Sequence, residues 1–168
     1  MRKLLILAFI AANSYSIKVA TQALPNRIIT PGATCEITIA ELCRKGFSHD
    51  ARDVSKALKK AVFTEYGIPW SEHGKYEVDH LCSLELGGSN EQKNLWPQPY
   101  TGEWNAHKKD GLENHLHALV CEQNSKVTLA DAQNAIIENW IEAYDKYMKI
   151  GIGDAKLMKV KLGASHGK

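Results

Sequence analysis

The chain has 168 residues, of which 44% are hydrophobic and 24% charged, and a formal net charge of +2. This length is enough to bury a core without a metal or disulfides as staples, so one ordinary globular domain is expected. Arg2 and Lys3 account for the excess charge. Without them the balance neither indicates nor excludes a nucleic-acid partner, because such binding needs only local positive charge.

The N-terminus has the pattern of an export signal. Residues 1–3 carry positive charge, Leu4 to Ala12 is an apolar run, and small residues at 12, 14 and 16 offer cleavage positions. The run is far shorter than the roughly twenty apolar residues that span a bilayer. We predict a signal peptide over residues 1–22, cut between Asn13 and Leu24. The protein would then be exported, periplasmic or secreted, without a stable membrane anchor; a retained N-terminal helix is the alternative.

Residues 23–150 are predicted to form the single domain, and its first part is helical. Thr38 to Glu41 has the form of a capping box and opens a short helix that stops at Gly46. A second helix is expected from about residue 50 to residue 66, because apolar residues recur at helical spacing and Gly67 follows.

The middle of the chain changes to extended structure. Residues 76–86 alternate in a way that predicts a strand, bent after His80. Residues 87–90 are a turn signal. A second short strand is expected over residues 94–97, because Pro97 and Pro99 forbid a long one.

Helical periodicity returns over about residues 104–121 and again over about 129–148, where Thr128 and Asp131 form a cap pair. Trp96 and Trp104 are expected to pack in the core. Residues 151–168 are predicted to be a flexible tail.

The four cysteines are Cys35, Cys43, Cys82 and Cys121. In an exported chain an even number suggests two disulfides. Nearness in the sequence favours a bond between Cys35 and Cys43, which leaves Cys82 and Cys121 as the second pair. The absence of any Cys-x-x-Cys pair makes a structural zinc site of the thiolate type unexpected.

One stretch carries most of the chemistry. Asp79 and His80 stand where the first strand bends, a Gly-rich turn and Asn94 follow, and a polar helix start carries His107. Adjacent strand residues point to opposite faces, so the bend is needed to bring Asp79 and His80 to one site. There the imidazole can act as a base while the carboxylate holds a divalent ion, which suits cleavage of a phosphodiester.

Three segments resemble the HNH endonuclease family: Tyr76 to Leu81, Leu84 to Asn90 and Asn94 to Pro97. The resemblance implies an α+β fold with a ββα-metal core, two strands and a helix around one divalent ion, covering about residues 76–121. N- and C-terminal helices would flank this core. The implied activity is metal-dependent hydrolysis of phosphodiester bonds in DNA, or in RNA.

The resemblance also implies roles for individual residues. His80 matches the general base, Asp79 the metal ligand, and Asn94 the residue that fixes the loop and orients the base or, in some branches, joins the metal shell. His107 matches the helix-borne metal ligand, but its spacing from Asn94 is longer than usual. Asn105 and Asp110 compete for that position. Glu113 is either a partner that orients a ligand or, as slightly preferred, an exposed helix carboxylate.

The metal and the partners follow from the same chemistry. Mg²⁺ is expected first, because hard cations prefer oxygen ligands, and a histidine ligand would shift the preference toward Mn²⁺, Ni²⁺ or Zn²⁺. Arg52, Lys108 and Lys109 are candidate phosphate contacts. The protein is expected to act as a monomer on nucleic acid, DNA first, with an inhibitor or immunity protein as a further candidate partner.

Two alternatives of other classes remain. The first is a catalytically inactive, secreted binding module that is stabilised by disulfides on an HNH scaffold. The second is a structural zinc protein that uses a cysteine with His107, His115 and His117, although otherwise His115 and His117 are expected to be surface or structural residues.

Overall fold

The computed structural model describes residues 23–151. The predicted signal peptide and nearly all of the predicted tail lie outside this range. Within it, helices surround one two-stranded antiparallel sheet, so the predicted α+β class is confirmed. No helix of this part of the chain is long and apolar enough to cross a membrane. The elements in chain order are α1 (Ile39–Leu42), α2 (Phe47–Ala51), α3 (Lys56–Glu65), η1 (Trp70–Lys75), β1 (Tyr76–His80), η2 (Leu84–Leu86), η3 (Gln92–Asn94), β2 (Leu95–Pro99), α4 (Ala106–Cys121) and α5 (Leu129–Tyr147).

The sheet pairs β1 with β2 so that Asp79 lies opposite Trp96 and His80 opposite Leu95. The second strand reaches Pro99, two residues beyond its predicted end, for a geometric reason. The backbone N–H of Tyr100 donates to the carbonyl of Lys75 at 3.0 Å. Because hydrogen-bonded positions alternate along an antiparallel ladder, the proline nitrogens point away from β1 and no bond of the ladder is lost.

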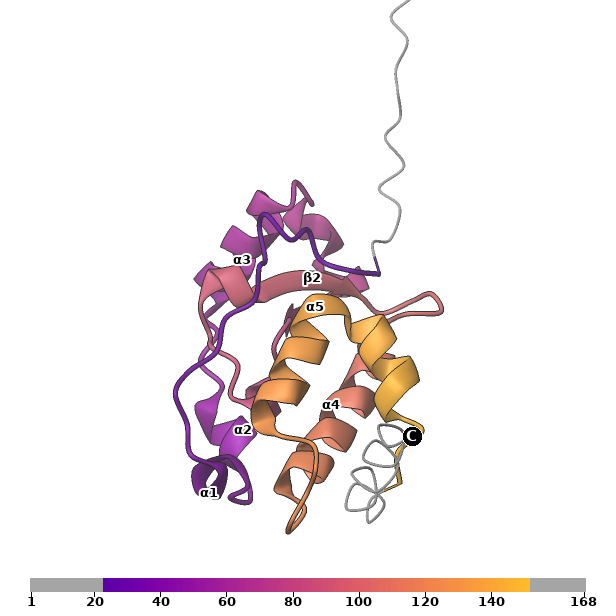
Figure 1. Cartoon of the computed structure of the whole chain (residues 1–168). Helices are drawn as coiled ribbons and strands as arrows, with labels where there is room; N and C mark the ends of the chain where they lie inside the picture. Colours follow the sequence, from indigo (N-terminus) through magenta and orange to yellow (C-terminus); the bar gives the residue numbers. More distant parts are fainter. Residues whose placement is uncertain (1–22, 152–168) are drawn as a thin grey trace, which may run out of the picture.

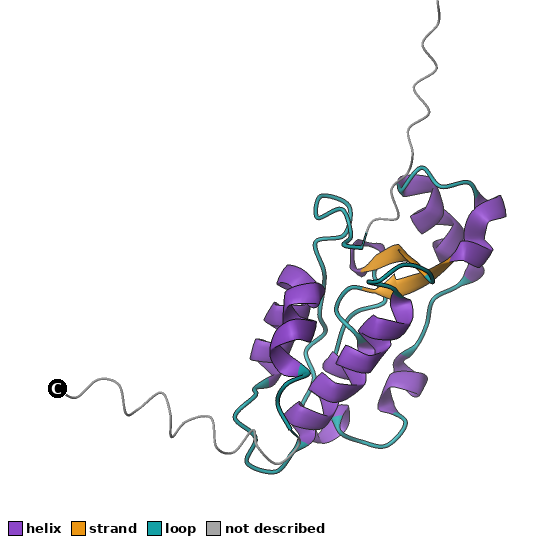
Figure 2. Cartoon of the chain, turned by 90° about the vertical axis from the view of Figure 1, so that its right-hand side faces the viewer, coloured by secondary structure: helices purple, strands orange, loops and turns teal. Residues whose placement is uncertain are grey.

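The two faces of the sheet meet different helices. Val78 and Leu95 pack against Val62 and Phe63 of α3. Asp79 lies on the other face and contacts Lys109 of α4. In Figure 1, α3 lies on one side of β2 while α4 and α5 lie on the other, and Figure 2 shows both strands between these groups of helices.

Helices α4 and α5 build most of the main core. Its buried members on these helices are Leu112, Leu116, Leu119, Val120, Ala132, Ile136, Trp140 and Ala143, as their helical spacing predicted. Each large apolar side chain buried in this way contributes about 1.5–3 kcal/mol relative to exposure. Asn139 interrupts α5 with non-helical backbone angles, and its Oδ1 accepts hydrogen bonds from the N–H groups of Ile141 and Glu142. The bend is visible in Figure 1.

Two predicted elements are shorter in the structure. The helix expected over about residues 50–66 is divided into α2 and α3, and Ser55 caps α3 through its side chain. The strand expected to continue to Leu86 ends at His80. It ends there because the amide of Asn94 binds both the N–H and the carbonyl of Cys82, which replaces a strand partner.

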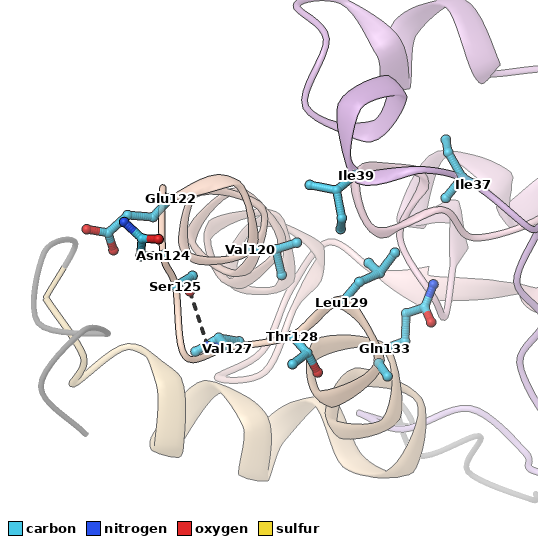
Figure 3. A pocket seen from close by; sticks show the side chains of 11 residues that line it. Ile37, Ile39, Val120, Glu122, Asn124, Ser125, Val127, Thr128, Leu129 and Gln133 are labelled. Atoms are coloured by element: carbon cyan, nitrogen blue, oxygen red, sulfur yellow. Dashed lines mark hydrogen bonds between the residues drawn. The ribbon is translucent and has the colours of Figure 1, made fainter. Parts of the chain in front are cut away.

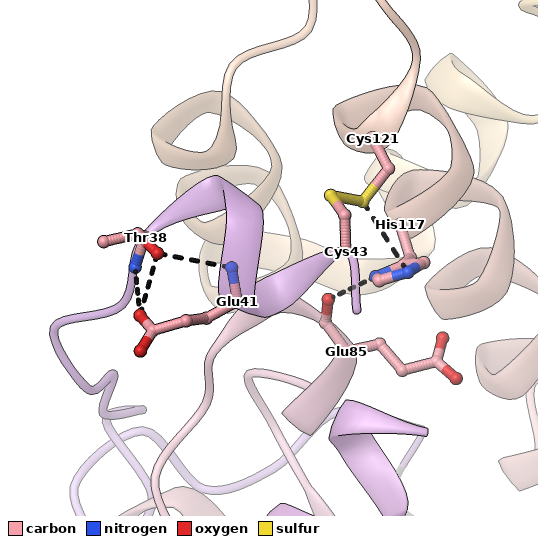
Figure 4. Close-up of a disulfide and its surroundings, with 6 residues drawn as sticks. All are labelled: Thr38, Glu41, Cys43, Glu85, His117 and Cys121. Carbon is pink, nitrogen blue, oxygen red and sulfur yellow. Dashed lines mark hydrogen bonds between the residues drawn. A yellow bond between two sulfur atoms is a disulfide. The ribbon is translucent and has the colours of Figure 1, made fainter. Parts of the chain in front are cut away.

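The predicted disulfide pairing was wrong. Cys43 at the end of α1 is bonded to Cys121 at the end of α4, with the Cα atoms 5.6 Å apart. Figure 4 shows this bond beside His117. Cys35 is an exposed free thiol and Cys82 a buried one. Burial raises the pKa of the Cys82 thiol to about 12. Nearness in sequence misled the prediction, because packing brings the ends of α1 and α4 together.

Candidate active site

The centre of the candidate site is a buried lysine between two carboxylates. Lys109 is 0% exposed. Its Nζ donates to Oδ2 of Asp79 and to the carbonyl of His80, both at 2.7 Å, and also to Oε1 of Glu113. Glu113 lies one helical turn further along α4, so both side chains of the helix reach the end of β1. The slightly preferred prediction that Glu113 is solvent-exposed was therefore wrong.

Lys109 was a candidate phosphate contact, and its burial contradicts that role. All three donors of its ammonium group are used inside the protein. A buried ammonium with three acceptors is a fixed part of the site and is not available to a ligand. Lys109 instead holds Asp79 and the end of β1 in place.

Negative charge exceeds positive charge around Lys109. Burial raises the pKa of Glu113, and the charge of Asp79 adds to this shift although Lys109 opposes it. Burial likewise raises the pKa of Glu77 and the pKa of Asp110, and Asp79 again adds to both. The negative charges of these carboxylates therefore repel one another, and a further cation among them would lower the free energy needed to ionise them.

His80 is held on one edge by an asparagine that the sequence interpretation did not single out. Nε2 of His80 lies 3.0 Å from Oδ1 of Asn90. The orientation of the Asn90 amide is set, because its Nδ2 donates to the carbonyl of Ala51 at 2.8 Å and its Oδ1 also accepts from the N–H of Asp53. Nε2 must then be the protonated nitrogen, which leaves the lone pair on Nδ1. Burial lowers the pKa of His80, so the imidazole is neutral near pH 7.

Asn94 clamps the turn between the strands and does not touch His80. Its oxygen accepts from the N–H groups of Ala33 and Cys82, and its nitrogen donates to the carbonyls of Cys82 and Ser89. The side chain is fully buried and all four of its hydrogen-bonding positions are used. Gly88 completes the turn, since a Cβ there would lie 1.8 Å from the carbonyl oxygen of Cys82. Of the two roles predicted for Asn94, the geometry matches fixing the loop.

The first turn of α4 holds the candidates for a helix-borne metal ligand. The side chain of His107 is 73% exposed, stacks on the ring of Tyr100, and has Nδ1 3.9 Å from Oδ2 of Asp110. Asn105 caps α4, because its Oδ1 accepts from the N–H of Lys108 and its Nδ2 donates to a loop carbonyl. The Asn105 oxygen is therefore occupied by the N-terminal cap of α4, and His107 and Asp110 remain as candidate metal ligands.

The other two predicted phosphate contacts differ in their surroundings. Nζ of Lys108 lies 4.1 Å from the ring centroid of Trp104 and forms a cation–π interaction with it. Arg52 is exposed and makes no ion pair within residues 23–151. Its charge nevertheless acts on both Glu77 and His80. Arg52 is thus the exposed cation next to the candidate site.

The candidate ligand atoms suit a weakly bound hard cation. They do not suit a metal centre that is coordinated by protein side chains alone. Among the described residues no three His, Cys, Asp or Glu side chains converge as a metal cluster. Mg²⁺ needs only one or two protein carboxylates because it keeps waters and binds substrate phosphates. Asp79 and Asp110 supply such oxygens. Gln98 lies opposite Glu77 on β2, and neither atom of its buried amide has a hydrogen-bond partner among the described groups, which further suits a polar occupant near this face.

The structural-zinc alternative does not match the geometry. His115 is held by the carbonyls of Tyr147 and Ile150 through Nε2, and Nδ1 of His117 lies 2.7 Å from the carbonyl of Glu85. Both rings therefore bind backbone carbonyls of segments that pack against α4. This agrees with the expectation that His115 and His117 are structural residues. With His107 exposed at the other end of the helix, the three histidines do not form one site.

A further cavity of the described residues lies away from this site. It has a volume of about 610 Å³ and is lined mainly by apolar and uncharged residues at the start of α1, the end of α4, the following loop and the start of α5, among them Ile39, Val120 and Leu129. Figure 3 shows these side chains around it. Glu122 is the one charged residue among those that line it, so it offers less polar chemistry than the residues at the end of β1.

Compared with known proteins, the chain matches no family model, no curated protein and no solved structure. Its function must therefore follow from the chemistry of its own residues.

Proposed function

We propose that the protein is a metal-dependent endonuclease of the HNH type, with β1, β2 and α4 as its ββα-metal core. The observation that carries the proposal is the neutral imidazole of His80. It follows Asp79 at the end of β1, where the Asp79 carboxylate and the His80 carbonyl bind the same Lys109 ammonium, and its Nε2 is bound to Asn90 with the lone pair on Nδ1. A base with a fixed tautomer next to an anionic oxygen ligand is the arrangement that phosphodiester hydrolysis requires.

In this mechanism each residue has a defined task. Nδ1 of His80 takes a proton from a water molecule, and the resulting hydroxide attacks phosphorus while the P–O bond to the leaving 3′ oxygen breaks. Asn90 stabilises the imidazolium that forms, because its oxygen accepts from the protonated Nε2. Asp79 and Asp110 would hold the divalent ion, which supplies positive charge for the phosphate and the leaving oxygen. Lys109 keeps the Asp79 carboxylate in place throughout.

The mechanism sets one structural requirement. His80 is 1% exposed in the free protein. Binding of the phosphodiester must therefore admit a water molecule to the Nδ1 edge of the ring. Catalytic contacts often form only in the complex with substrate, so this requirement is compatible with the proposal.

The proposal also covers the substrate, the cellular location and the partners of the protein. A site built from a base and carboxylates acts on the backbone and not on base edges, so little sequence preference is expected. DNA is the first substrate to test and RNA the second. Export by residues 1–22, action as a monomer and restraint by an inhibitor or immunity protein belong to the proposal as well.

A second candidate function is an inactive binding module on the same scaffold. Two observations favour it: Lys109 already neutralises much of the charge of Asp79, and His80 is buried. Calorimetric titration with Mg²⁺, Mn²⁺ and Zn²⁺ separates the two functions. Binding of a divalent ion that depends on Asp79 supports the nuclease, and no binding of any of the three supports the module.

The proposed function is tested by nicking of supercoiled plasmid in Mg²⁺, Mn²⁺, Ni²⁺ or EDTA. Removal of a general base typically costs 10²–10⁴-fold in rate, so His80→Ala is expected to lose about that much. His49→Ala is the matched control, because the His49 side chain is 93% exposed on α2. Nicking that persists in EDTA, or that His80→Ala leaves at the wild-type rate, overturns the assignment.

A further inference from the structure

A second cavity lies beside the candidate site, between α3, η1 and β1. It has a volume of about 320 Å³. This is at the lower end of the range of small-ligand pockets, enough for a single nucleotide and too small for a duplex. Arg52 lines it together with Glu77 and Val78 of β1, and Asp79 and His80 follow these two residues directly in the same strand. A ligand in this groove would therefore lie beside the strand that carries the candidate site.

The groove has two exposed cations among its lining residues and one carboxylate, that of Glu77. Arg52 and Lys59 line it, both are exposed, and neither forms an ion pair in residues 23–151. Lys60 adds a third cation near the rim, with Nζ 5.7 Å from the ring centroid of Trp70. Cations that outnumber the anions in a concave site raise the local concentration of a phosphate-bearing ligand.

The groove also offers flat rings. The rings of Trp70 and His73 are stacked with centroids 4.6 Å apart and an interplanar angle of 5°. His73 is exposed, and its Nδ1 lies 2.8 Å from the carbonyl of Trp70, which fixes the ring. Tyr100, 37% exposed, also lines the groove. Rings that are held in place lose little entropy when a nucleobase stacks on them.

We infer that this groove, defined by Arg52, Lys59, Trp70, His73 and Tyr100, binds an unpaired nucleotide of the strand next to the scissile phosphate. The inference rests on the proposed nuclease function and names its preferred substrate as single-stranded nucleic acid. Phosphates contact Arg52 and Lys59, and a base stacks on His73. Since every base has a flat face, this binding tolerates any sequence.

The test measures binding without cleavage. Fluorescence anisotropy in EDTA follows a labelled 12-nucleotide single strand, as DNA or RNA, and a DNA duplex of the same sequence. We expect the single strand to bind at least tenfold more tightly than the duplex. Loss of one stacking ring, in His73→Ala, should weaken single-strand binding about tenfold. Lys59→Ala should reduce the slope of log Kd against log salt by about 0.7.

Lys56→Ala is the matched control, because Lys56 is an exposed lysine on α3 that does not line the groove. Its binding should equal that of the wild type. Circular dichroism confirms that each variant is folded. The inference is overturned if the duplex binds as tightly as the single strand, or if His73→Ala and Lys59→Ala bind like Lys56→Ala. Cleavage of the same labelled single strands in Mg²⁺ or Mn²⁺ is measured separately. Single-strand binding without cleavage overturns the proposed nuclease function but not binding in the groove, and cleavage that His73→Ala and Lys59→Ala leave unchanged overturns the groove but not the nuclease.

Discussion

Lys109 and Asp79 form an ion pair that is closed to solvent, with Nζ 2.7 Å from Oδ2 and no surface of the lysine side chain exposed. The pair joins α4 to the end of β1, across 30 residues of sequence. Glu113 contacts the same ammonium, so a single lysine compensates two carboxylates. This relationship links the stability of the fold to the geometry of the candidate site.

Lys109→Met is therefore expected to destabilise the protein strongly. The substitution keeps the apolar stem but leaves Asp79 and Glu113 buried without their cation, and such losses cost about 3–5 kcal/mol. The measurement is the free energy of unfolding in urea, with Lys126→Met, at an exposed position, as control. A variant as stable as the control would show that the pair contributes nothing net.

Asn90 is expected to position the base. Asn90→Ala removes the acceptor of the His80 Nε2 proton, and one lost hydrogen bond of this kind is worth about 1–2 kcal/mol, or roughly tenfold in kcat. Asn114→Ala, an exposed asparagine on α4, should leave the rate unchanged. Equal rates for both variants would remove Asn90 from the mechanism. KM should change less than kcat, because Asn90 acts through His80 and not on the substrate.

The rate should depend on pH through His80. Because burial lowers the pKa of His80 below its ordinary value of 6.5, the imidazole stays neutral and active at pH values where a free histidine is protonated. Activity should fall only as the pH drops through this lowered pKa. The hydrogen bond that His80 donates to Asn90 raises the pKa of His80, so Asn90→Ala should move the acid limb of the kcat–pH profile to lower pH. A limb above pH 6.5, or one that moves upward in the variant, contradicts this assignment.

The same shift has a consequence for stability. The unfolded chain binds a proton at His80 more readily than the folded protein does. The contribution of His80 is thus fully present above pH 6.5 and is lost as the pH falls through the lower folded pKa. Urea unfolding of wild type and His80→Gln across pH 5–7 measures it, and the two curves should converge toward acid pH. Curves that stay parallel would mean that His80 is not the titrating group.

Thiol labelling tests the disulfide. In the native protein without reductant, only Cys35 should react with a maleimide, because Cys82 is buried and its pKa is raised to about 12. Unfolding without reductant should expose a second thiol, and reduction should expose four. Peptide mapping should recover Cys43 linked to Cys121. A peptide that joins Cys82 to Cys121 instead would contradict the structure.

The elements that sequence patterns located well are those with local signals. Capping boxes at Thr38 and Thr128 mark the starts of α1 and α5, and the apolar stripes of α4 and α5 became the main core. The end of β1 was harder to predict. The alternation of residues 76–86 continues past His80, but the side chain of Asn94 captures Cys82 and stops the strand.

The residues of the candidate site show the same difference between local signals and contacts that depend on folding. Asp79, His80 and Asn94 could be chosen from the sequence because they stand at the ends of short elements with a glycine turn between them. The partners that set their chemistry could not. Asn90 reaches His80 through a folded turn, and Lys109 was taken for a surface lysine because nothing in its neighbourhood in sequence marks it as buried.

The sequence by itself thus determined the class of fold and the helices with strong periodicity, and it singled out Asp79, His80 and Asn94 as candidate site residues. Only the tertiary structure decided which cysteines are bonded, which lysine is buried and which asparagine holds the base. Periodicity and caps are properties of a few neighbouring residues. The Cys43–Cys121 bond and the Lys109–Asp79 pair join residues 78 and 30 positions apart, so they depend on how the helices pack against the sheet.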